Sequence, residues 1–311
     1  MLKVESIVKV YGNRHVVDGV SFEVSKGEIV GFLGVNGAGK TTTMDIICGC
    51  LGADSGTVTI DGHDILREPE LAKKNIGYLT DRSALYDDMT VYRYIDYMAT
   101  LHGMKGGESK KKSVEDVIDM LDLRGERDRI IGHLSKGYKR RTALAGVLVH
   151  DPKVIVLDEP TEGLDPLQIK QFRQILGNIS EQKAIFLSSH ILQEIEQICD
   201  HIVMIDRGRI VDQRGLNTGE GEGSFLVKHK RPLDENTTKV VSSLKDVKNV
   251  FPISDREFGV DFLMAEHSDD FDGAVEALMA CVFEHDLGLV EFKRRSKRYE
   301  HMFDGISSEK R

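Results

Sequence analysis

Residues 34–42 read Gly34-Val35-Asn36-Gly37-Ala38-Gly39-Lys40-Thr41-Thr42. This stretch fits the pattern G-x-x-x-x-G-K-S/T, in which glycines let the backbone curl so that several N–H groups point at one anion. A lysine adds positive charge for the outer phosphates of a nucleotide, and a threonine hydroxyl is a ligand for Mg²⁺. The stretch therefore predicts a phosphate-binding loop, with contacts from Gly34, Asn36, Gly37, Ala38, Gly39, Lys40, Thr41 and Thr42.

The segments on either side of this loop have the character that such a site needs. Glu28 to Leu33 is short and mostly apolar, which predicts a buried strand, and Thr41 to Cys50 predicts a helix. A helix that begins at the loop directs the positive end of its dipole at the bound anion. A chance glycine-rich turn is the alternative, and the strand-loop-helix order argues against it.

A second apolar run ends in two carboxylates. Val154 to Leu157 predicts a buried strand, and Asp158, Glu159 and Pro160 follow it. Such a strand can deliver Asp158 to Mg²⁺ beside the phosphates and place Glu159 where it can polarise an attacking water. An ordinary strand with polar residues at its end is the alternative, and the phosphate-binding loop weakens it.

Length and composition are those of a globular protein. The chain has 311 residues, of which 40% are hydrophobic and 30% charged, so it can hold one large domain or two of ordinary size. No apolar run approaches the roughly 18 residues of a membrane span, and the N-terminus lacks the core of a secretion signal. A net charge of −9 argues against a general nucleic-acid binder. The cysteines have no metal-ligand spacing and are expected to be reduced, structural thiols.

The chain changes character along its length in a way that predicts subdomains. Residues 2–10, 20–24 and 58–60 predict an antiparallel sheet beside the phosphate-binding core. From residue 83 to about 150, apolar residues recur at helical spacing, and Lys110-Lys111-Lys112 is expected to face solvent. Predicted strands then alternate with helices, which indicates a parallel sheet; the strands are 154–157, 184–187 and 202–205, and the helices 167–179 and 191–199.

A polar, glycine-rich run at residues 216–223 predicts a linker. Residues 224–311 then predict a small α+β domain of split β-α-β type, with strands near 224–229, 248–253, 258–264 and 288–293 and helices near 235–245 and 270–285. A basic cluster near its end is expected to be solvated, with an acidic partner or an anionic membrane as alternatives; it comprises Arg294, Arg295, Lys297 and Arg298.

The motifs, in their order along residues 2–215, resemble those of the ATP-binding subunits of ATP-binding cassette (ABC) transporters. The loop at residues 34–42 is similar to the family's Walker A loop, and Val154 to Glu159 to its Walker B strand. The resemblance places further elements: Tyr11 as the aromatic that stacks on adenine, Asp81 in the place of the Q-loop glutamine, Leu134-Ser135-Lys136-Gly137-Tyr138 as the signature sequence, Gly163-Leu164-Asp165 as the D-loop, and His190 as the switch histidine.

The resemblance implies a fold and a division into domains. The expected fold class is α/β, a P-loop NTPase with a RecA-like core, an antiparallel β subdomain and a helical subdomain. The ATPase domain would be residues 1–215, with the helical subdomain at about 83–150. The linker at 216–223 would join it to the C-terminal α+β domain at 224–311.

The resemblance also implies the ligands and the roles of the site residues. ATP and Mg²⁺ would bind, with Thr41, Asp158 and Asp81 near the metal. Lys40, Glu159 and His190 would be catalytic, with Glu159 as general base and His190 bonded to the γ-phosphate. The signature residues Ser135, Lys136 and Gly137 would contact a γ-phosphate held by a different subunit, and Asp165 would lie nearby.

Several of these positions have a simpler structural explanation. Ser135 can be only the N-cap of a helix predicted from Tyr138 to about Val149, and His190 a satisfied histidine at a strand end. Tyr11 can pack on the core, and Asp165 can be a turn-former that caps a helix at Pro166.

Two residues depart from the family pattern. Lys136 stands where the signature usually has glycine, and Asp81 replaces the Q-loop glutamine. Asp81 puts a third carboxylate beside Asp158 and Glu159, which can raise a carboxylate pKa or bind the metal more directly.

Within the family, the chain is most similar to ATPase subunits of ABC-2 type exporters. The resemblance implies ATP hydrolysis coupled to transport, a second ATPase subunit, a polytopic membrane permease, no nucleic-acid partner, and a cytoplasmic location on the membrane face. The contact with the permease would lie around Tyr86 to Tyr92. A soluble ATPase of the same family and a non-catalytic nucleotide-binding regulator are the alternatives.

Overall fold

The computed structural model describes residues 1–81, 85–216, 222–230, 235–254, 256–265, 271–284 and 289–294. The chain divides into two compact units, Met1–Leu216 and Asn217–Arg311. Most of the predicted linker, residues 217–221, lies outside the described residues. Its last two positions, Glu222 and Gly223, open the strand β11 (Glu222–His229), so the linker prediction is wrong there. Glu222 is already paired with Ala265 of a neighbouring strand, which fixes the backbone in the sheet.

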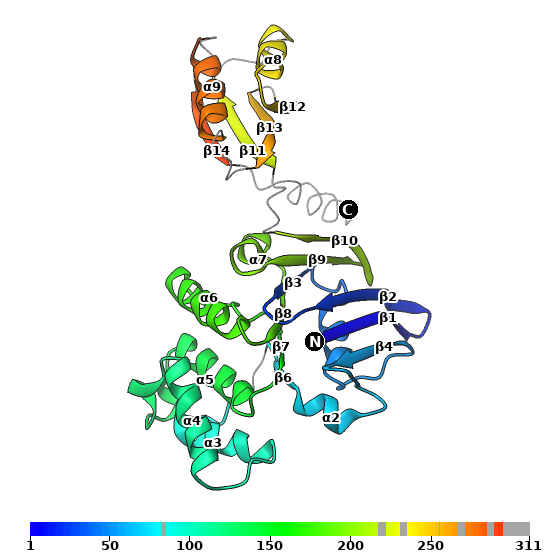
Figure 1. Ribbon diagram of the computed structural model, residues 1–311, viewed down its shortest axis with the longest axis vertical. Helices are drawn as coiled ribbons and strands as arrows, with labels where there is room; N and C mark the ends of the chain where they lie inside the picture. Colours follow the sequence, from blue (N-terminus) through cyan, green and yellow to red (C-terminus); the bar gives the residue numbers. More distant parts are fainter. Residues whose placement is uncertain are drawn as a thin grey trace. The chain divides into compact units, whose positions relative to one another are not determined.

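A six-stranded sheet forms the centre of the first unit (Figure 1). Five of its strands are parallel, and the edge strand β10 pairs with β9 in the antiparallel sense. Four strands were predicted, whereas β6 and β10 were not. The order across the sheet is β10 (Arg209–Gly215), β9 (His201–Asp206), β3 (Ile29–Leu33), β8 (Ala184–Ser189), β7 (Val154–Leu157) and β6 (Ile76–Leu79).

An antiparallel sheet covers one face of this central sheet, as the sequence predicted. Its strand order is β2 (Arg14–Val24), β1 (Leu2–Tyr11), β4 (Ser55–Ile60) and β5 (His63–Asp64). Helix α1 (Lys40–Ile47) shares one hydrophobic core with both sheets. The stacked rings of Phe22 and Phe186, with centroids 4.7 Å apart, join the two sheets within this core.

Helices cover the opposite face of the central sheet. Helix α7 (Leu192–Ile198) approaches β3 so closely that a Cβ added at Gly31 would lie 2.6 Å from a methyl carbon of Ile195. Helix α6 (Pro166–Ser180) lies on the same side, and its N-cap is Asp165, whose side chain forms a capping box with Gln168. A short helix α2 (Pro69–Lys74) precedes β6.

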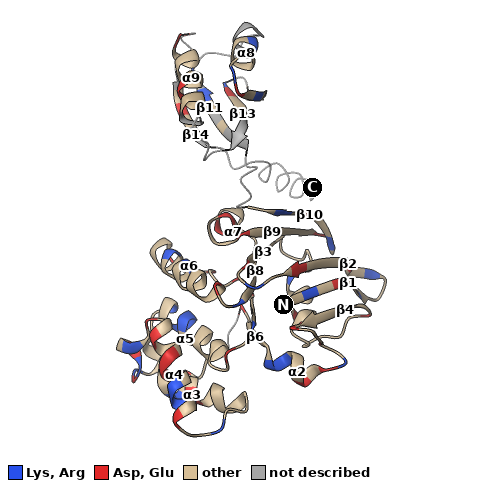
Figure 2. Ribbon diagram, in the orientation of Figure 1, with Lys and Arg blue, Asp and Glu red and all other residues tan. Residues whose placement is uncertain are grey.

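The helical subdomain consists of α3 (Val91–Leu101), α4 (Glu108–Met120) and α5 (Lys136–Leu148). Its predicted first residue, Ser83, lies outside the described residues. Residues of both charge signs lie along α4 (Figure 2). Lys110 is buried and pairs with Asp96 of α3 at 2.7 Å, so the prediction that it faces solvent is wrong, because its ammonium joins two helices.

Helix α5 begins at Lys136, two residues before the predicted start at Tyr138. Ser135 is its N-cap, and the Ser135 hydroxyl accepts a hydrogen bond from the Tyr138 N–H at 3.4 Å. Gly137 therefore lies inside the first turn of the helix rather than before it. A serine N-cap typically stabilises a helix by about 1 kcal/mol, so this serine has a structural role in the free subunit.

The second unit has the element order β-α-β-β-α-β of a split β-α-β domain. After β11 come α8 (Glu235–Ser242), β12 (Val247–Ser254), β13 (Glu257–Ala265), α9 (Phe271–Glu284) and β14 (Leu289–Arg294). The strand order is β12-β13-β11-β14, and all pairs are antiparallel. Of the predicted basic cluster, only Arg294 is within the described residues. Neither unit, where it is described, contains a helix with the length and apolar character of a membrane span.

Candidate active site

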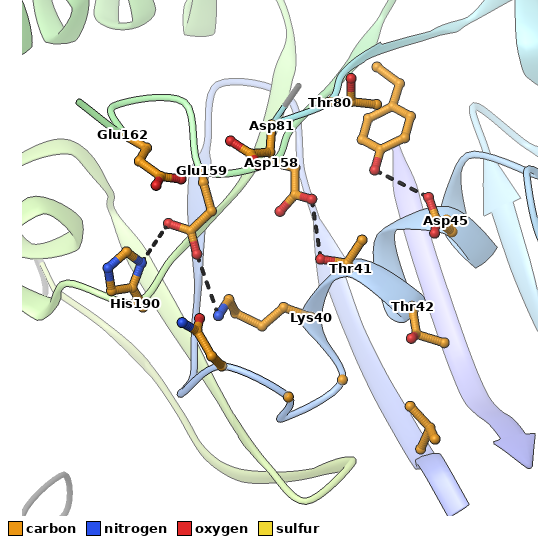
Figure 3. A pocket seen from close by; sticks show the side chains of 15 residues that line it. Lys40, Thr41, Thr42, Asp45, Thr80, Asp81, Asp158, Glu159, Glu162 and His190 are labelled. Atoms are coloured by element: carbon orange, nitrogen blue, oxygen red, sulfur yellow. Dashed lines mark hydrogen bonds and ion pairs between the residues drawn. The ribbon is translucent and has the colours of Figure 1, made fainter. Parts of the chain in front are cut away.

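A cavity of about 650 Å³ opens at the carboxyl ends of the parallel strands, beside the loop of residues 34–42. This is the edge of an α/β sheet where ligands usually bind. Figure 3 shows Lys40 and Thr41 facing the carboxylates of Asp158 and Glu159 across the cavity. The lining residues are Val16, Asn36, Gly37, Gly39, Lys40, Thr41, Thr42, Asp45, Tyr78, Thr80, Asp81, Asp158, Glu159, Glu162 and His190.

The loop has a backbone conformation that requires glycine at residue 39. Gly39 has φ +110° and is the N-cap of α1. A Cβ at this position would lie 2.6 Å from the carbonyl oxygen of Val16. The loop can therefore wrap an anion at the start of α1 only because this residue has no side chain.

Lys40 is held at the floor of the cavity by its own loop. Its ammonium donates to the carbonyl oxygen of Gly34 at 2.7 Å and lies 3.4 Å from Oε1 of Glu159. The residue is only 6% exposed. Gly34 therefore contributes its carbonyl oxygen to Lys40 and does not line the cavity. Ala38 is buried and does not line the cavity either.

Asp158 is a buried carboxylate supported by two hydroxyl groups. Ser188 donates to Oδ1 at 2.6 Å, and Thr41 donates to Oδ2 at 3.3 Å. Burial raises the pKa of Asp158, and the charges of Glu159 and Asp81 act in the same direction, while the two hydrogen bonds oppose them. A cation beside Thr41 would stabilise this carboxylate. A hydroxyl and one carboxylate suit Mg²⁺, which takes its other ligands from phosphates and water.

Glu159 lies between the two other predicted catalytic residues. His190 Nδ1 is 3.0 Å from its Oε2, and Lys40 approaches the other carboxylate oxygen (Figure 3). The backbone of Glu159 has φ +45°, which is uncommon for a residue with a side chain. Its N–H donates to the Ser188 hydroxyl at 2.9 Å, so one serine supports both acidic residues.

Asp81 lines the same cavity as Asp158 and Glu159. Among the described residues, no three Asp, Glu, His or Cys side chains are arranged as a preformed metal site. The position of Asp81 is therefore compatible with an electrostatic influence on Asp158, and its role as a metal ligand stays a prediction.

The remaining predicted residues lie outside this cavity. Tyr11 is 52% exposed at the end of β1, and Asp165 caps α6, which is its simpler predicted role. Gly137 packs against the Gln168 side chain. Lys136 lines a neighbouring cavity of about 390 Å³, which it shares with Asp81, Glu159 and Glu162, and Ser135 is occupied as an N-cap.

Five lining residues were not predicted from the sequence: Val16, Asp45, Tyr78, Thr80 and Glu162. Thr80 and Glu162 flank predicted motifs, so proximity in sequence could have indicated them. The Tyr78 hydroxyl donates to Asp45 at 3.3 Å, and this bond between β6 and α1 depends on tertiary structure. Burial raises the pKa of Tyr78. Val16 lies on β2 and has no sequence signal of its own.

Comparisons with known proteins agree with this geometry. The sequence profile of the ABC transporter family matches residues 17–162. The linearmycin resistance ATP-binding protein LnrL of Bacillus subtilis is 31% identical over 307 residues, which cover 97% of each chain. The bacitracin transport ATP-binding protein BcrA of Bacillus licheniformis is 34% identical over 215 residues, covering 68% of this chain and 69% of the relative.

Solved structures share the fold of the first unit. An ATP-binding subunit of an ABC transporter is 28% identical with a TM-score of 0.63, over 70% of this chain and 90% of that one. The subunit cbiO1 from Clostridium perfringens, part of the ABC transporter complex cbiONQ, is 29% identical with a TM-score of 0.63, over 69% and 88%. With its near full-length match to a curated relative, the chain belongs to the ATP-binding subunits of ABC transporters.

Proposed function

We propose that this protein hydrolyses ATP to drive export across a membrane, as the ATPase subunit of an ABC-2 type transporter. The observation that carries the proposed ATP hydrolysis is the position of Glu159. Its carboxylate lies between His190 at 3.0 Å and Lys40 at 3.4 Å, beside the phosphate-binding loop. A carboxylate that lies next to the expected γ-phosphate position is suited to polarise an attacking water.

The reaction would be ATP + H₂O → ADP + phosphate. The loop amides and the Lys40 ammonium would bind the phosphates, and Glu159 would accept a proton from the attacking water. His190, oriented by its contact with Glu159, would donate a hydrogen bond to the γ-phosphate. Phosphoryl transfer depends mostly on positioning and electrostatic stabilisation, so each of these groups is expected to matter strongly.

Mg²⁺ would be held by the Thr41 hydroxyl and Asp158, and when bound it would neutralise charge on the phosphates. Asp81 would tune this site through its charge. Asp81→Ala is then expected to change the Mg²⁺ concentration that gives half-maximal turnover. An unchanged Mg²⁺ dependence would exclude this role for Asp81.

A second ATPase subunit would complete the site. Ser135, Lys136 and Gly137 lie at the start of α5, outside the cavity that contains Lys40. In a dimer of such subunits they would serve the ATP of the partner, and closure of the dimer around ATP would transmit force to a permease. Two solved dimeric structures of an ABC cassette, at 22% identity, share the fold of the first unit.

Export is supported by the relatives rather than by the cavity. One is described as a linearmycin resistance protein and another as a bacitracin transport protein. The match to the former spans both units, including the C-terminal α+β unit. A permease would contact the surface around Tyr86, which is 44% exposed, on the cytoplasmic side of the membrane.

Turnover by the purified full-length protein and by Glu159→Gln tests the enzymatic part. We expect steady ATP hydrolysis by the wild type and its loss in the variant, with binding of a fluorescent ATP analogue retained. Normal turnover by Glu159→Gln would refute the assignment of the base. A wild type that binds ATP without turnover would favour the alternative of a non-catalytic nucleotide-binding regulator.

Copurification with a polytopic membrane protein tests the transport part of the proposal. Its failure would favour the alternative of a soluble ATPase of the same family.

A further inference from the structure

Arg140, in the second turn of α5, makes an unusual set of hydrogen bonds behind the catalytic cavity. Its Nε donates to the carbonyl oxygen of Pro160 at 3.0 Å. Its Nη1 donates to the carbonyls of Thr80 at 3.1 Å and Asp81 at 3.0 Å. Its Nη2 donates to the carbonyls of Asp158 at 2.9 Å and Glu159 at 3.0 Å. Among the described contacts, these bonds engage all three nitrogens of the guanidinium, which has five N–H groups.

The five carbonyl groups belong to two chain segments that are far apart in sequence. Thr80 and Asp81 follow β6, and residues 158–160 follow β7, the neighbouring parallel strand. These two segments carry the three carboxylates Asp81, Asp158 and Glu159, which line the cavity. One side chain therefore ties together the backbone of all three acidic residues.

The bond to Glu159 also bears on a strained position. A positive φ at a residue other than glycine destabilises the folded protein by about 1 kcal/mol or more. Such a conformation persists only when contacts with the surrounding structure hold it. The N–H of Glu159 is bonded to Ser188, and its carbonyl is bonded to Arg140. The two peptide units on either side of the Glu159 Cα are thus each held by a hydrogen bond.

Arg140 also contributes a positive charge next to the acidic cluster. Burial lowers the pKa of the guanidinium, while the charges of Asp81, Asp158 and Glu162 raise it. An arginine stays protonated at such a site, so its positive charge offsets part of the repulsion among the carboxylates. The ammonium of Lys40, at the floor of the cavity, has the same effect on Glu159.

We propose that Arg140 is a positioning residue for the ATPase reaction, which holds the ends of β6 and β7 so that Asp81, Asp158 and Glu159 converge on one nucleotide. The inference rests on the proposed function, and it adds a residue outside the family motifs described above. A lysine could keep the charge at this position but has only three N–H groups for five carbonyls. A glutamine would lose the charge and most of the bonds.

Arg140→Lys and Arg140→Gln test the proposal, with Arg141→Gln as the matched control. Arg141 is the next residue of α5 and is more deeply buried than Arg140, but it bonds to Asp122 at 3.2 Å and Gln171 at 2.6 Å, away from the cavity. We expect kcat to fall about tenfold in Arg140→Lys and about 100-fold in Arg140→Gln, since small displacements of catalytic groups have effects of this size. The KM for ATP should change little, because the loop that binds the phosphates has no described contact with Arg140.

A double-mutant cycle links Arg140 to the acidic cluster. Asp81→Asn combined with Arg140→Gln should lower kcat by less than the product of the two single effects, because both act on one unit. Asp81→Asn combined with Arg141→Gln should be multiplicative. Equal coupling in the two cycles would contradict the proposal.

Amide hydrogen exchange supplies a readout that does not depend on turnover. Arg140→Gln should speed exchange in peptides that cover residues 79–81 and 158–162, whereas Arg141→Gln should leave them unchanged. Unchanged exchange in both segments, or a kcat within about twofold of the wild type, would overturn the positioning role. An inactive wild type would refute the proposed ATPase instead, and the exchange result would still decide whether Arg140 holds the two strand ends.

Discussion

His190 Nδ1 lies 3.0 Å from Oε2 of Glu159, so the histidine and the carboxylate act as one hydrogen-bonded pair. The two residues follow the neighbouring parallel strands β8 and β7, which explains why positions 31 residues apart meet. Loss of the imidazole would leave one carboxylate oxygen of Glu159 without this partner.

We expect His190→Ala to lower kcat about 100-fold, with little change in ATP-analogue binding, because loss of one hydrogen-bond donor to charge that develops in the transition state typically costs about this much. His190→Asn is the matched variant, since an asparagine amide can take the place of Nδ1 beside Glu159. It should keep more activity than His190→Ala. Equal loss in both variants would show that the contact with Glu159 is not what matters.

A second prediction concerns Ser188, which is fully buried and joins Asp158 to the Glu159 backbone. Ser188→Ala leaves a buried N–H and a buried carboxylate oxygen without this partner, so we expect a loss of about 1–3 kcal/mol in the free energy of unfolding and a clear fall in kcat. Ser180→Ala is the control, because Ser180 is also buried but bonds to Gly177 on α6. Urea unfolding and ATPase assays should show lower stability in both variants and lower kcat only in the first.

The motif residues of the phosphate-binding loop and the β7 strand end could be placed from the sequence because each motif is a local segment with fixed spacing. The fold brings Lys40, Thr41, Asp158, Glu159 and His190 to one cavity, as their motifs suggested. The C-terminal element order was likewise readable from alternating apolar segments and helical periods.

Residues whose role depends on partners distant in the chain could not be found in this way. Arg140 bonds to backbone carbonyls, which have no sequence signature. Lys110 belongs to a run of three lysines, and only its buried contact with Asp96 distinguishes it from a solvated residue. The edge strand β10 has a largely exposed, mixed pattern, so tertiary pairing with β9 decides its structure.

A third prediction concerns the D-loop. Gly163 has φ +69°, and a Cβ there would lie 1.8 Å from the Lys136 ammonium. Gly163→Ala should destabilise the protein by about 1–2 kcal/mol because of its backbone conformation. The exposed Lys136 side chain can move away from the new methyl group, so Lys136→Ala should not change this cost and the two effects should be additive in thermal unfolding. A double variant that is more stable than the sum of the single effects would show that Lys136 is held in place.

A fourth prediction concerns a stacked histidine pair, His102 and His150, with ring centroids 3.6 Å apart and an interplanar angle of 7°. Burial lowers the pKa of His150 to about 4, and the charge of His102 acts in the same direction. Burial also lowers the pKa of His102. The folded protein therefore disfavours protonation of the pair.

The sign of the pH dependence follows from these directions. Above pH 6.5 His150 is neutral in both the folded and the unfolded chain, so it contributes no pH dependence there. Between about pH 6.5 and pH 4, His150 is protonated in the unfolded chain but neutral in the folded chain. The free energy of unfolding therefore falls as the pH is lowered, by up to about 3 kcal/mol from this residue. Below pH 4 this contribution levels off. His150→Gln should remove this part of the decline, which urea unfolding at pH 8, 6.5, 5 and 4 would measure. An identical decline in wild type and variant would mean that His150 is protonated as readily in the folded protein as in the unfolded one.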